Sequence, residues 1–340
     1  MKAFLTGGAG FLGRQVVQRL LADGHHVVCM LRARSNADNL RADAAKPGVR
    51  GTLEIIRGHI GRPDTYKDAL AGSDVVYHIA AEMKGATAVL FLTNVVGTRA
   101  LIAASQQAQV KRFVLVSSLG VYSATGVPSG GTLDENVPLD PKPHLRDPYS
   151  YSKIAEEKVA WDAHKTQGLP LVVIRPGVIY GPGRDWITGR TGLRMDTVLL
   201  KMGGHQVVPY TYVDNCADAV YLAGTVAGVE GQVFNVIDDN PPTVNALVRR
   251  YKREIGKLHV VPIPRFAIGT VSGIFEWYNR YSNGQLPAVM SRYKSQAMWK
   301  RQRFANDKAK RGLGWTPATS FEEGLARTAE SLRAPARSRA

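Results

Sequence analysis

Cysteine, acidic side chains and long apolar runs are all scarce in this sequence of 340 residues. The only cysteines are Cys29 and Cys216, and two thiols cannot by themselves build a disulfide scaffold or a metal site. We find no run of about 20 apolar residues, so no membrane-spanning helix is expected. The first residues reach a glycine cluster at once, which does not fit a secretory signal. We therefore expect a globular cytoplasmic protein without a metal site.

The shortage of acidic residues is concentrated in the C-terminal part of the chain. Lys and Arg number 44 against 28 Asp and Glu, a net charge of +16. Residues 241–340 hold 19 Lys and Arg and 6 Asp and Glu, a balance of +13 that leaves +3 for the first 240 residues. This distribution predicts a nearly neutral catalytic body and a basic C-terminal surface that faces something anionic.

The first half alternates short apolar runs with helical stretches, the pattern of a parallel sheet covered on both faces. We expect strands at residues 2–6, 26–31, 53–57, 74–79, 112–117, 171–175 and 233–237. We expect helices at residues 11–23, 89–107 and 149–166. The sequence therefore predicts an α/β fold, a Rossmann-type doubly wound parallel sheet with a smaller C-terminal substrate-binding lobe. The NADP-binding domain would span 1–176 and regain the strand near 233–237, the lobe would take most of 177–330, and 331–340 would form a disordered tail.

A glycine cluster between the first strand and the first helix has the spacing of a dinucleotide-binding loop. It reads Thr6-Gly7-Gly8-Ala9-Gly10-Phe11-Leu12-Gly13. Gly7 suits a tight turn, Gly10 lets the backbone approach a pyrophosphate, and Gly13 lets the helix pack closely on the sheet. The helix N-terminus would then offer free N–H groups and a positive dipole to the phosphates. The alternative is a glycine turn that binds nothing, but the strand–loop–helix context favours a cofactor site.

No acidic residue follows the second expected strand, where an NAD site usually places one to bind the ribose 2′-OH. The segment reads Leu31-Arg32-Ala33-Arg34-Ser35. Arg32, with Arg34 or Ser35 beside it, suits a 2′-phosphate through charge-assisted hydrogen bonds. The alternative is that the two arginines are solvated surface residues. We predict NADP(H) as the preferred cofactor, with NAD(H) as the alternative.

Tyr149 and Lys153 stand one helical turn apart, so their side chains emerge on the same face. A tyrosine normally holds its proton until a pH of about 10, and a neighbouring ammonium favours the phenolate. We expect the ammonium and a positive nicotinamide together to bring this pKa into the working range, so that Tyr149 acts as an acid or base. Ser117 and Ser118 end the fifth strand, at the edge where open α/β sheets bind ligands. Ser118 would hydrogen-bond the reacting oxygen, and the alternative for both serines is to cap the next turn.

In this order the motifs resemble the extended short-chain dehydrogenase/reductase family and its NAD-dependent epimerase/dehydratase group. The likeness runs from residue 1 to about 240 and returns weakly near 313–324. Further matching segments are His78-Ile79-Ala80-Ala81, Asn94-Val95-Val96-Gly97-Thr98, Ser117-Ser118-x-x-Val121-Tyr122, Arg175-Pro176-Gly177-x-x-Tyr180-Gly181-Pro182-Gly183 and Tyr212-Val213-Asp214-Asn215.

The resemblance assigns roles to individual residues. It implies that Tyr149 is the acid/base, that Lys153 lowers its pKa and binds the nicotinamide ribose, that Ser118 orients the substrate oxygen, and that Asn94 supports the adjoining helix. The chain departs from the family at Gly58-His59-Ile60, where an Asp is common near the adenine. The cofactor-binding residues expected are Gly7, Gly10, Phe11, Leu12, Gly13, Arg32, Ser35, His59, Ile60, Ala80, Tyr149, Lys153, Pro176 and Val178.

One position in the motif that begins at Arg175 bears on the substrate. Sugar-nucleotide enzymes that this chain resembles commonly carry Asn three residues after that arginine, where this chain has Val178. An apolar side chain cannot donate to a diphosphate, although Val178 would equally suit core packing. The sequence of residues 175–183 is more similar to the 3β-hydroxysteroid dehydrogenase-like branch than to the sugar-nucleotide enzymes. The resemblance therefore implies an oxidoreductase that interconverts a ketone and a secondary alcohol on a hydrophobic, lipid-like substrate such as a sterol or long-chain oxo-lipid. The alternatives are a nucleotide-sugar epimerase or dehydratase and a non-catalytic NADP-binding sensor.

Bulky apolar side chains crowd residues 265–281, and residues 290–312 then hold eight Lys and Arg against one acid, Asp307. Apolar and aromatic residues beside basic ones suit peripheral contact with an anionic membrane. The alternative is a core helix followed by a solvated basic face or a subunit contact, as in a homodimer. No nucleic-acid-binding motif accompanies the charge, so we expect no nucleic-acid partner.

Overall fold

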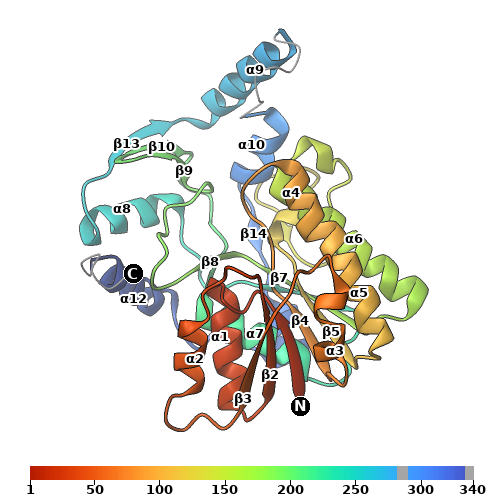
Figure 1. The fold of residues 1–340 in the computed structure, drawn as a ribbon. Coiled ribbons are helices and arrows are strands. Elements are labelled where there is room, and N and C mark those ends of the chain that lie inside the picture. The colour runs from red at the N-terminus through yellow and green to blue at the C-terminus, as the bar shows by residue number, and fades with distance from the viewer. Residues whose placement is uncertain (282–289, 334–340) are drawn as a thin grey trace.

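The computed structural model describes residues 1–281 and 290–333, and its centre is a parallel sheet of seven strands (Figure 1). Their order is β3-β2-β1-β4-β5-β7-β12, and every neighbouring pair is parallel. The chain moves outwards from β1 to β3 and then crosses back to β4 on the other side of β1. The expected fold class and all seven expected strands are confirmed. The strands are β1 (Lys2–Thr6), β2 (His26–Leu31), β3 (Thr52–Arg57), β4 (Val75–His78), β5 (Arg112–Val116), β7 (Leu171–Pro176) and β12 (Gln232–Val236).

Helices cover both faces of the sheet, which explains why its central strands are apolar at consecutive positions. Leu5 of β1 joins the core beneath α1 and α7, whereas the adjacent Phe4 joins the core beneath α5 and α6. Both side chains are wholly buried. The four helices are α1 (Phe11–Ala22), α5 (Thr98–Gln107), α6 (Pro148–Gln167) and α7 (Val213–Thr225).

The helix expected at residues 89–107 consists of α4 (Thr87–Phe91), a π-helical turn η2 (Leu92–Gly97) and α5. By length and composition, residues 87–107 could cross a membrane, with a mean hydropathy of 1.6 in their apolar window, and this segment was not identified from the sequence. A core helix passes the same test, and 44% of this apolar window is buried inside the structure. Its buried side carries Asn94 and Thr98, which hydrogen-bond within the sheet domain.

The smaller lobe contains short sheets and helices, while two elements after residue 177 return to the sheet domain. β12 lies beside β7, and α7 packs against α1. The strands of the lobe are β8 (Val178–Tyr180), which pairs with β11 (Tyr210–Tyr212), and β9 (Gly192–Met195), β10 (Val198–Met202) and β13 (His259–Ile263), which form a sheet. The later helices are α8 (Val244–Glu254), α9 (Arg265–Tyr281), α10 (Arg292–Trp299), α11 (Asp307–Leu313) and α12 (Phe321–Arg333).

A long loop after β5 covers the carboxyl edge of the sheet and is held there by the chain after α10. Lys300 donates from Nζ to the Thr125 oxygen (2.9 Å), and Gln302 donates to the Ala124 oxygen (2.8 Å). The short strands β6 (Thr132–Leu133) and β14 (Arg303–Phe304) pair next to these contacts. The remaining short elements are α2 (Asp38–Ala44), α3 (Lys67–Leu70) and 3-10 turns at Pro63–Thr65, Leu119–Val121 and Pro143–Leu145.

The end of the chain differs from the expected disordered tail. Residues 331–333 belong to α12, where Leu332 packs against the main core and Arg333 donates from Nε to the Glu254 oxygen. These contacts hold the last turn of the helix, so the prediction is wrong for those three residues. The rest of the expected tail, 334–340, lies outside the described residues.

Candidate active site

The loop from Thr6 to Gly13 joins β1 to α1 at the carboxyl edge of the sheet. Gly7 has a φ of +81°, and a Cβ there would lie 2.6 Å from the Ala80 nitrogen, so the backbone angle and the space both require glycine. A Cβ on Gly13 would lie 2.1 Å from the Gly7 oxygen. Gly13 therefore lets α1 close onto the loop, whereas the sequence led us to expect close packing onto the sheet.

The N-terminus of α1 is open to an anion. Its N-cap, Gly10, has no side chain to bond the first N–H groups, and the first turn carries no acid. Phe11 lies under the Arg184 guanidinium, 4.3 Å from the ring centroid, and Leu12 is buried. Free N–H groups at the positive end of a helix dipole suit phosphate, so this loop fits the pyrophosphate of a dinucleotide.

The other expected cofactor residues follow strands along the same edge but differ in access. His59 comes after β3 and is exposed, whereas Ile60 is buried in the core beneath α5 and α6. Pro176 ends β7 and is buried. Val178 is partly buried against the main core, and its N–H donates to the Pro209 oxygen (2.6 Å). Ile60 and Val178 therefore serve core packing in the structure.

Three arginines gather where β2 and β3 end. Arg57, the last residue of β3, donates from Nη1 to the carbonyl oxygens of Arg32 (2.9 Å) and Ser35 (2.7 Å), which fixes the turn after β2. The Arg32 side chain is 76% exposed and donates to Glu82 Oε2 at 3.2 Å, and Arg34 is exposed beside it. Arg57 and Glu82 were not identified from the sequence, because each reaches this turn from a different strand end.

Tyr149 and Lys153, the expected acid/base pair, belong to the first turns of α6. The Asp147 carboxylate caps the helix by accepting from the Ser150 nitrogen (2.9 Å) and from Ser150 Oγ (2.7 Å). Pro148 occupies the first helical position, where its missing N–H costs nothing. Tyr149 follows directly and is half-buried. The cap therefore fixes where the helix begins and so where Tyr149 stands.

Burial raises the pKa of the Tyr149 phenol above its ordinary value. The Lys153 ammonium and a hydrogen bond with Ser118 lower that pKa, while the Glu156 and Asp147 carboxylates raise it. The Lys153 ammonium thus lowers this pKa, as expected, but burial outweighs it among the protein's own residues, and the net pKa lies above the ordinary value.

Ser117 and Ser118 are adjacent but face different surroundings. Ser117 is buried and donates to Glu157 Oε2 (2.5 Å), which also accepts from Arg175 Nε (3.1 Å). Ser118 is half-buried, caps the turn that follows, and lies within hydrogen-bonding reach of Tyr149. Of the two serines, Ser118 is the one beside the acid/base.

Asn94 lies wholly buried in the π-helical turn. Its Oδ1 accepts from the Glu82 nitrogen (2.7 Å), and its Nδ2 donates to the Glu82 oxygen (2.9 Å) and to Ser152 Oγ (2.9 Å). Asn94 therefore ties the segment after β4 to α6 between Tyr149 and Lys153. These bonds make it a positioning residue.

A buried carboxylate that was missed in the sequence faces Lys153. Glu156, one turn further along α6, forms an ion pair with the Lys153 ammonium, and both side chains are at most 1% exposed. Its Oε1 lies 3.4 Å from His78 Nε2 and 3.2 Å from Thr98 Oγ1. His78 Nδ1 is in turn 2.8 Å from Thr6 Oγ1. Polar contacts thus run from the catalytic helix to the strand that begins the glycine loop, and the i,i+3 spacing of Lys and Glu is their signal in the sequence.

An unpaired cation, also missed in the sequence, stands near the start of α6. Arg190 is half-buried near Arg146 and Asp147, and burial together with the Arg146 charge lowers the pKa of its guanidinium to about 10. Arg146 is paired with Asp140 at 2.7 Å. Within residues 1–281 and 290–333, Arg190 has no hydrogen-bond or ion-pair partner. Such a group, close to the helix start that carries Tyr149, suits an anionic part of a substrate.

The sequence and the fold are similar to those of known proteins. A model of the NAD dependent epimerase/dehydratase family matches residues 3–236. The 2-alkyl-3-oxoalkanoate reductase of Shewanella oneidensis is 28% identical, with 97% of this chain and 86% of the relative covered. The decarboxylating sterol-4-alpha-carboxylate 3-dehydrogenase of Saccharomyces cerevisiae is 28% identical, with 95% of each chain covered. A dTDP-glucose 4,6-dehydratase from Streptomyces venezuelae, solved with NAD bound, has a TM-score of 0.74 and 26% identity over 99% of this chain and 98% of that one.

We expect Tyr149→Phe to lower kcat by about 10²–10⁴-fold with little change in the Kd for NADPH, because only an ionisable hydroxyl is lost. Ser118→Ala should also slow turnover, whereas Ser117→Ala should act on stability, since its hydroxyl bonds Glu157 in the core. Steady-state kinetics, NADPH titration and thermal melts measure all three variants. If Ser117→Ala slows turnover and Ser118→Ala does not, Ser117 is the serine that contacts the reacting oxygen. If Tyr149→Phe keeps more than a tenth of the wild-type rate, Tyr149 is not the acid/base.

The Glu156 charge raises the pKa of Tyr149, so Glu156→Gln should lower it while keeping the shape of the side chain. When Tyr149 is the proton donor, activity is lost as the pH rises through this pKa. We expect Glu156→Gln to move the alkaline limb of the kcat profile to lower pH by about one unit. Glu157→Gln is the control, because that carboxylate bonds Ser117 and Arg175. An unmoved limb in folded Glu156→Gln would show that Glu156 serves stability alone.

Proposed function

The chain belongs to the NAD dependent epimerase/dehydratase family and is an NAD(P)-dependent oxidoreductase, and on that basis we propose that it reduces a ketone on a hydrophobic, lipid-like substrate to a secondary alcohol. We propose NADPH as its preferred reductant. The observation that carries the proposal is the placement of Tyr149 beside Ser118 and one turn from the buried Lys153, at the edge of the sheet where the glycine loop lies. A phenol that holds its proton at neutral pH suits donation to a carbonyl oxygen.

The reduction consumes one hydride and one proton. A nicotinamide dinucleotide held at the glycine loop and the N-terminus of α1 would supply the hydride for the carbonyl carbon. Ser118 hydrogen-bonds the carbonyl oxygen as negative charge develops there, and Tyr149 gives that oxygen its phenolic proton. Lys153, held by the Val116 oxygen (2.9 Å) and by Glu156, stabilises the phenolate until solvent returns the proton.

The substrate proposed here combines an apolar body with a carboxylate near the ketone. The names of two relatives, 2-alkyl-3-oxoalkanoate reductase and sterol-4-alpha-carboxylate 3-dehydrogenase, each describe such a compound for the relative. In this chain the unpaired guanidinium of Arg190 supports a carboxylate close to the reacting carbon. The apolar Val178 supports a substrate without a diphosphate.

A nucleotide-sugar epimerase or dehydratase is the alternative. The likeness to dTDP-glucose 4,6-dehydratase supports it, and the Arg190 guanidinium would equally suit a diphosphate. Such an enzyme regenerates its cofactor within each cycle, so net consumption of NADPH separates the two. A sensor that only binds NADP has no use for an acid/base pair, which counts against that third possibility.

We expect one NADPH to be oxidised for each alcohol formed from a 2-alkyl-3-oxo acid, and none to be consumed with UDP-glucose. Arg190→Gln should raise the KM for the acid about 10- to 100-fold, since a hydrogen bond to a charged group contributes about 1.5–3 kcal/mol. The methyl ester of the same acid is the control, and its KM should not change. Equal losses for acid and ester would give Arg190 a structural role, and turnover of UDP-glucose without NADPH loss would overturn the proposed reaction.

We expect the wild-type protein to bind NADPH more tightly than NADH. Arg32→Glu should weaken NADPH about 10- to 100-fold and NADH much less, because it removes a phosphate partner and adds a repelling charge. Fluorescence titration gives both Kd values. Arg99→Glu makes the same charge change on the exposed side of α5 and should alter neither. Equal wild-type affinity for both dinucleotides would contradict the 2′-phosphate site.

A further inference from the structure

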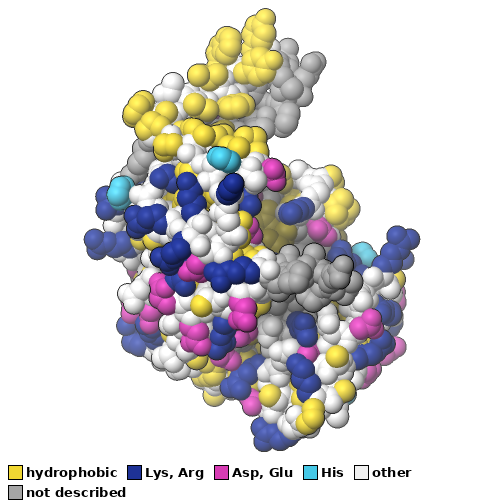
Figure 2. Space-filling view, turned by 90° about the vertical axis from the view of Figure 1, so that its left-hand side faces the viewer, with side chains coloured by type: hydrophobic (Ala, Val, Ile, Leu, Met, Phe, Trp, Pro, Cys, Tyr) yellow, Lys and Arg dark blue, Asp and Glu magenta, His cyan; other side chains and the backbone are white. Residues whose placement is uncertain are grey.

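Large apolar side chains are exposed together on α9 and on the strand before it. Eight of the fourteen exposed large apolar side chains in the described residues lie between residues 261 and 281. We call this set the apolar cap: Val261, Phe266, Val271, Ile274, Phe275, Trp277, Tyr278 and Tyr281. Figure 1 shows α9 projecting at the far end of the smaller lobe, and Figure 2 shows the hydrophobic surface gathered there. Soluble proteins rarely expose so large a continuous apolar surface unless something binds it.

The opposite face of α9 is fixed to α10. Ile268 is buried, and the Oγ atoms of Ser272 and Ser295 are 2.7 Å apart. Glu276 Oε1 accepts from the Arg292 nitrogen (2.7 Å). The helix therefore has one packed face and one outward face, so the cap is exposed while α9 is folded.

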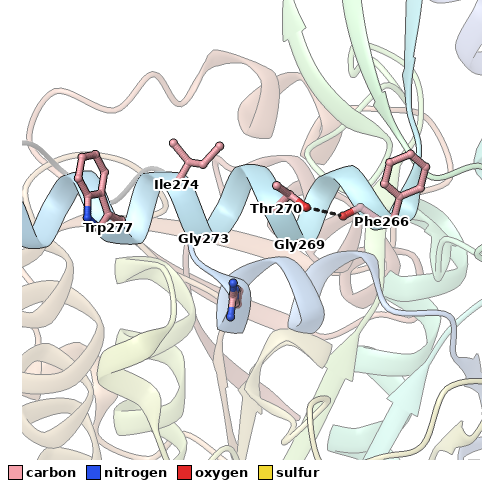
Figure 3. Close-up of a pocket in the computed structure, with 7 residues that line it drawn as sticks. Phe266, Gly269, Thr270, Gly273, Ile274 and Trp277 are labelled. Atoms are coloured by element: carbon pink, nitrogen blue, oxygen red, sulfur yellow. Dashed lines mark hydrogen bonds between the residues drawn. The ribbon is translucent and has the colours of Figure 1, made fainter.

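A shallow groove of about 500 Å³ runs along α9 (Figure 3). Phe266, Ile274 and Trp277 line it and rise from the same side of the helix. Arg292 lines it from α10, where its guanidinium lies against Gly273: a Cβ on that glycine would be 2.8 Å from Nη2. Apolar side chains with a cation at their border suit an acyl chain and its anionic headgroup.

Positive charge surrounds the cap. On the side of α8, residues 249–265 contain six Lys and Arg against one acid, Glu254, which pairs with Arg250 at 2.7 Å. The basic helix α8 lies below β13 in Figure 1 and exposes Arg249 and Lys252, and Lys257 follows it on the way to β13. Figure 2 shows Lys and Arg side chains on the body beneath the cap. A surface that is apolar at its tip and basic around it complements an anionic bilayer.

We infer that the apolar cap docks on an anionic lipid bilayer, with α9 in the boundary between headgroups and acyl chains and the basic residues of α8 over the headgroups. A second copy of the chain is disfavoured as the occupant, because each copy carries a net charge of +16 and would bring its own basic residues to the contact. The inference does not depend on the proposed reaction.

The apolar part of this face, α9, lies within the residues expected from the sequence, and the basic residues of α8 are added to it. Two of the basic residues in 290–312 are engaged by the body, because Lys300 bonds the Thr125 oxygen and Lys310 pairs with Asp239 at 2.7 Å. The chain turns back into the body there. The membrane contact is therefore assigned to α9 and α8.

Co-sedimentation with vesicles tests the inference without turnover. The probes are vesicles of phosphatidylcholine alone and of phosphatidylcholine mixed with phosphatidylglycerol. We expect binding to the anionic vesicles at low salt that weakens as salt rises, and much weaker binding to the neutral ones. The paired change Phe266→Ser and Trp277→Ser should weaken binding at least about tenfold, as should Arg249→Glu with Lys252→Glu.

The matched control is Leu92→Ser with Val96→Ser, which removes two exposed apolar side chains from the π-helical turn. It should leave vesicle binding unchanged, and all three variants should keep wild-type thermal melts. No binding to anionic vesicles at low salt, or equal losses in the cap variant and the control, would overturn the inference. The inference would also be overturned if the protein formed a dimer in solution, did not bind vesicles, and became monomeric only in the cap variant. The apolar cap would then be a subunit contact.

Discussion

A lysine ammonium and a carboxylate are enclosed together between α6 and the sheet, and the geometry of the site depends on that pair. Lys153 and Glu156 are almost fully buried, and charges so deeply buried are tolerated only when they are paired. The lysine also bonds the end of β5, and the carboxylate approaches His78 at the end of β4. A slide or rotation of α6 would leave a buried charge unpaired, so Tyr149 is held at the sheet edge where the glycine loop also lies.

The same pair sets the electrostatics of the reaction. The Glu156 carboxylate raises the pKa of Tyr149 whereas the Lys153 ammonium lowers it, and burial keeps this pKa above its ordinary value. A cation is therefore in position to stabilise the phenolate that the proposed proton transfer would form.

The sheet domain and the smaller lobe contribute different parts of the proposed function. The sheet edge supplies the dinucleotide loop, the acid/base and the serine, all from strand ends or helix starts that parallel topology brings together. The lobe supplies Arg190 beside the start of α6 and the apolar cap on α9. It therefore holds the features that bear on the choice of substrate and on where the protein meets it.

The seven strands, the glycine loop and the Tyr149–Lys153 pair are readable from the sequence, because each follows from local pattern: apolar runs, a turn that needs positive φ, and a spacing of one helical turn. Local pattern does not distinguish Ser117 from Ser118; the family resemblance singled out Ser118, and the packing of α6 shows which side of β5 holds Tyr149. The need for glycine at position 8 is likewise invisible in the local sequence. A Cβ on Gly8 would lie 2.2 Å from the sulfur of Cys29 on the neighbouring strand. The sequence by itself determined the fold class and the placement of Tyr149 and Lys153 on one face of a helix. Tertiary structure decided the burial of Tyr149, the partner of Lys153 and the exposure of α9, because burial and contact between distant segments exist only once the chain is folded.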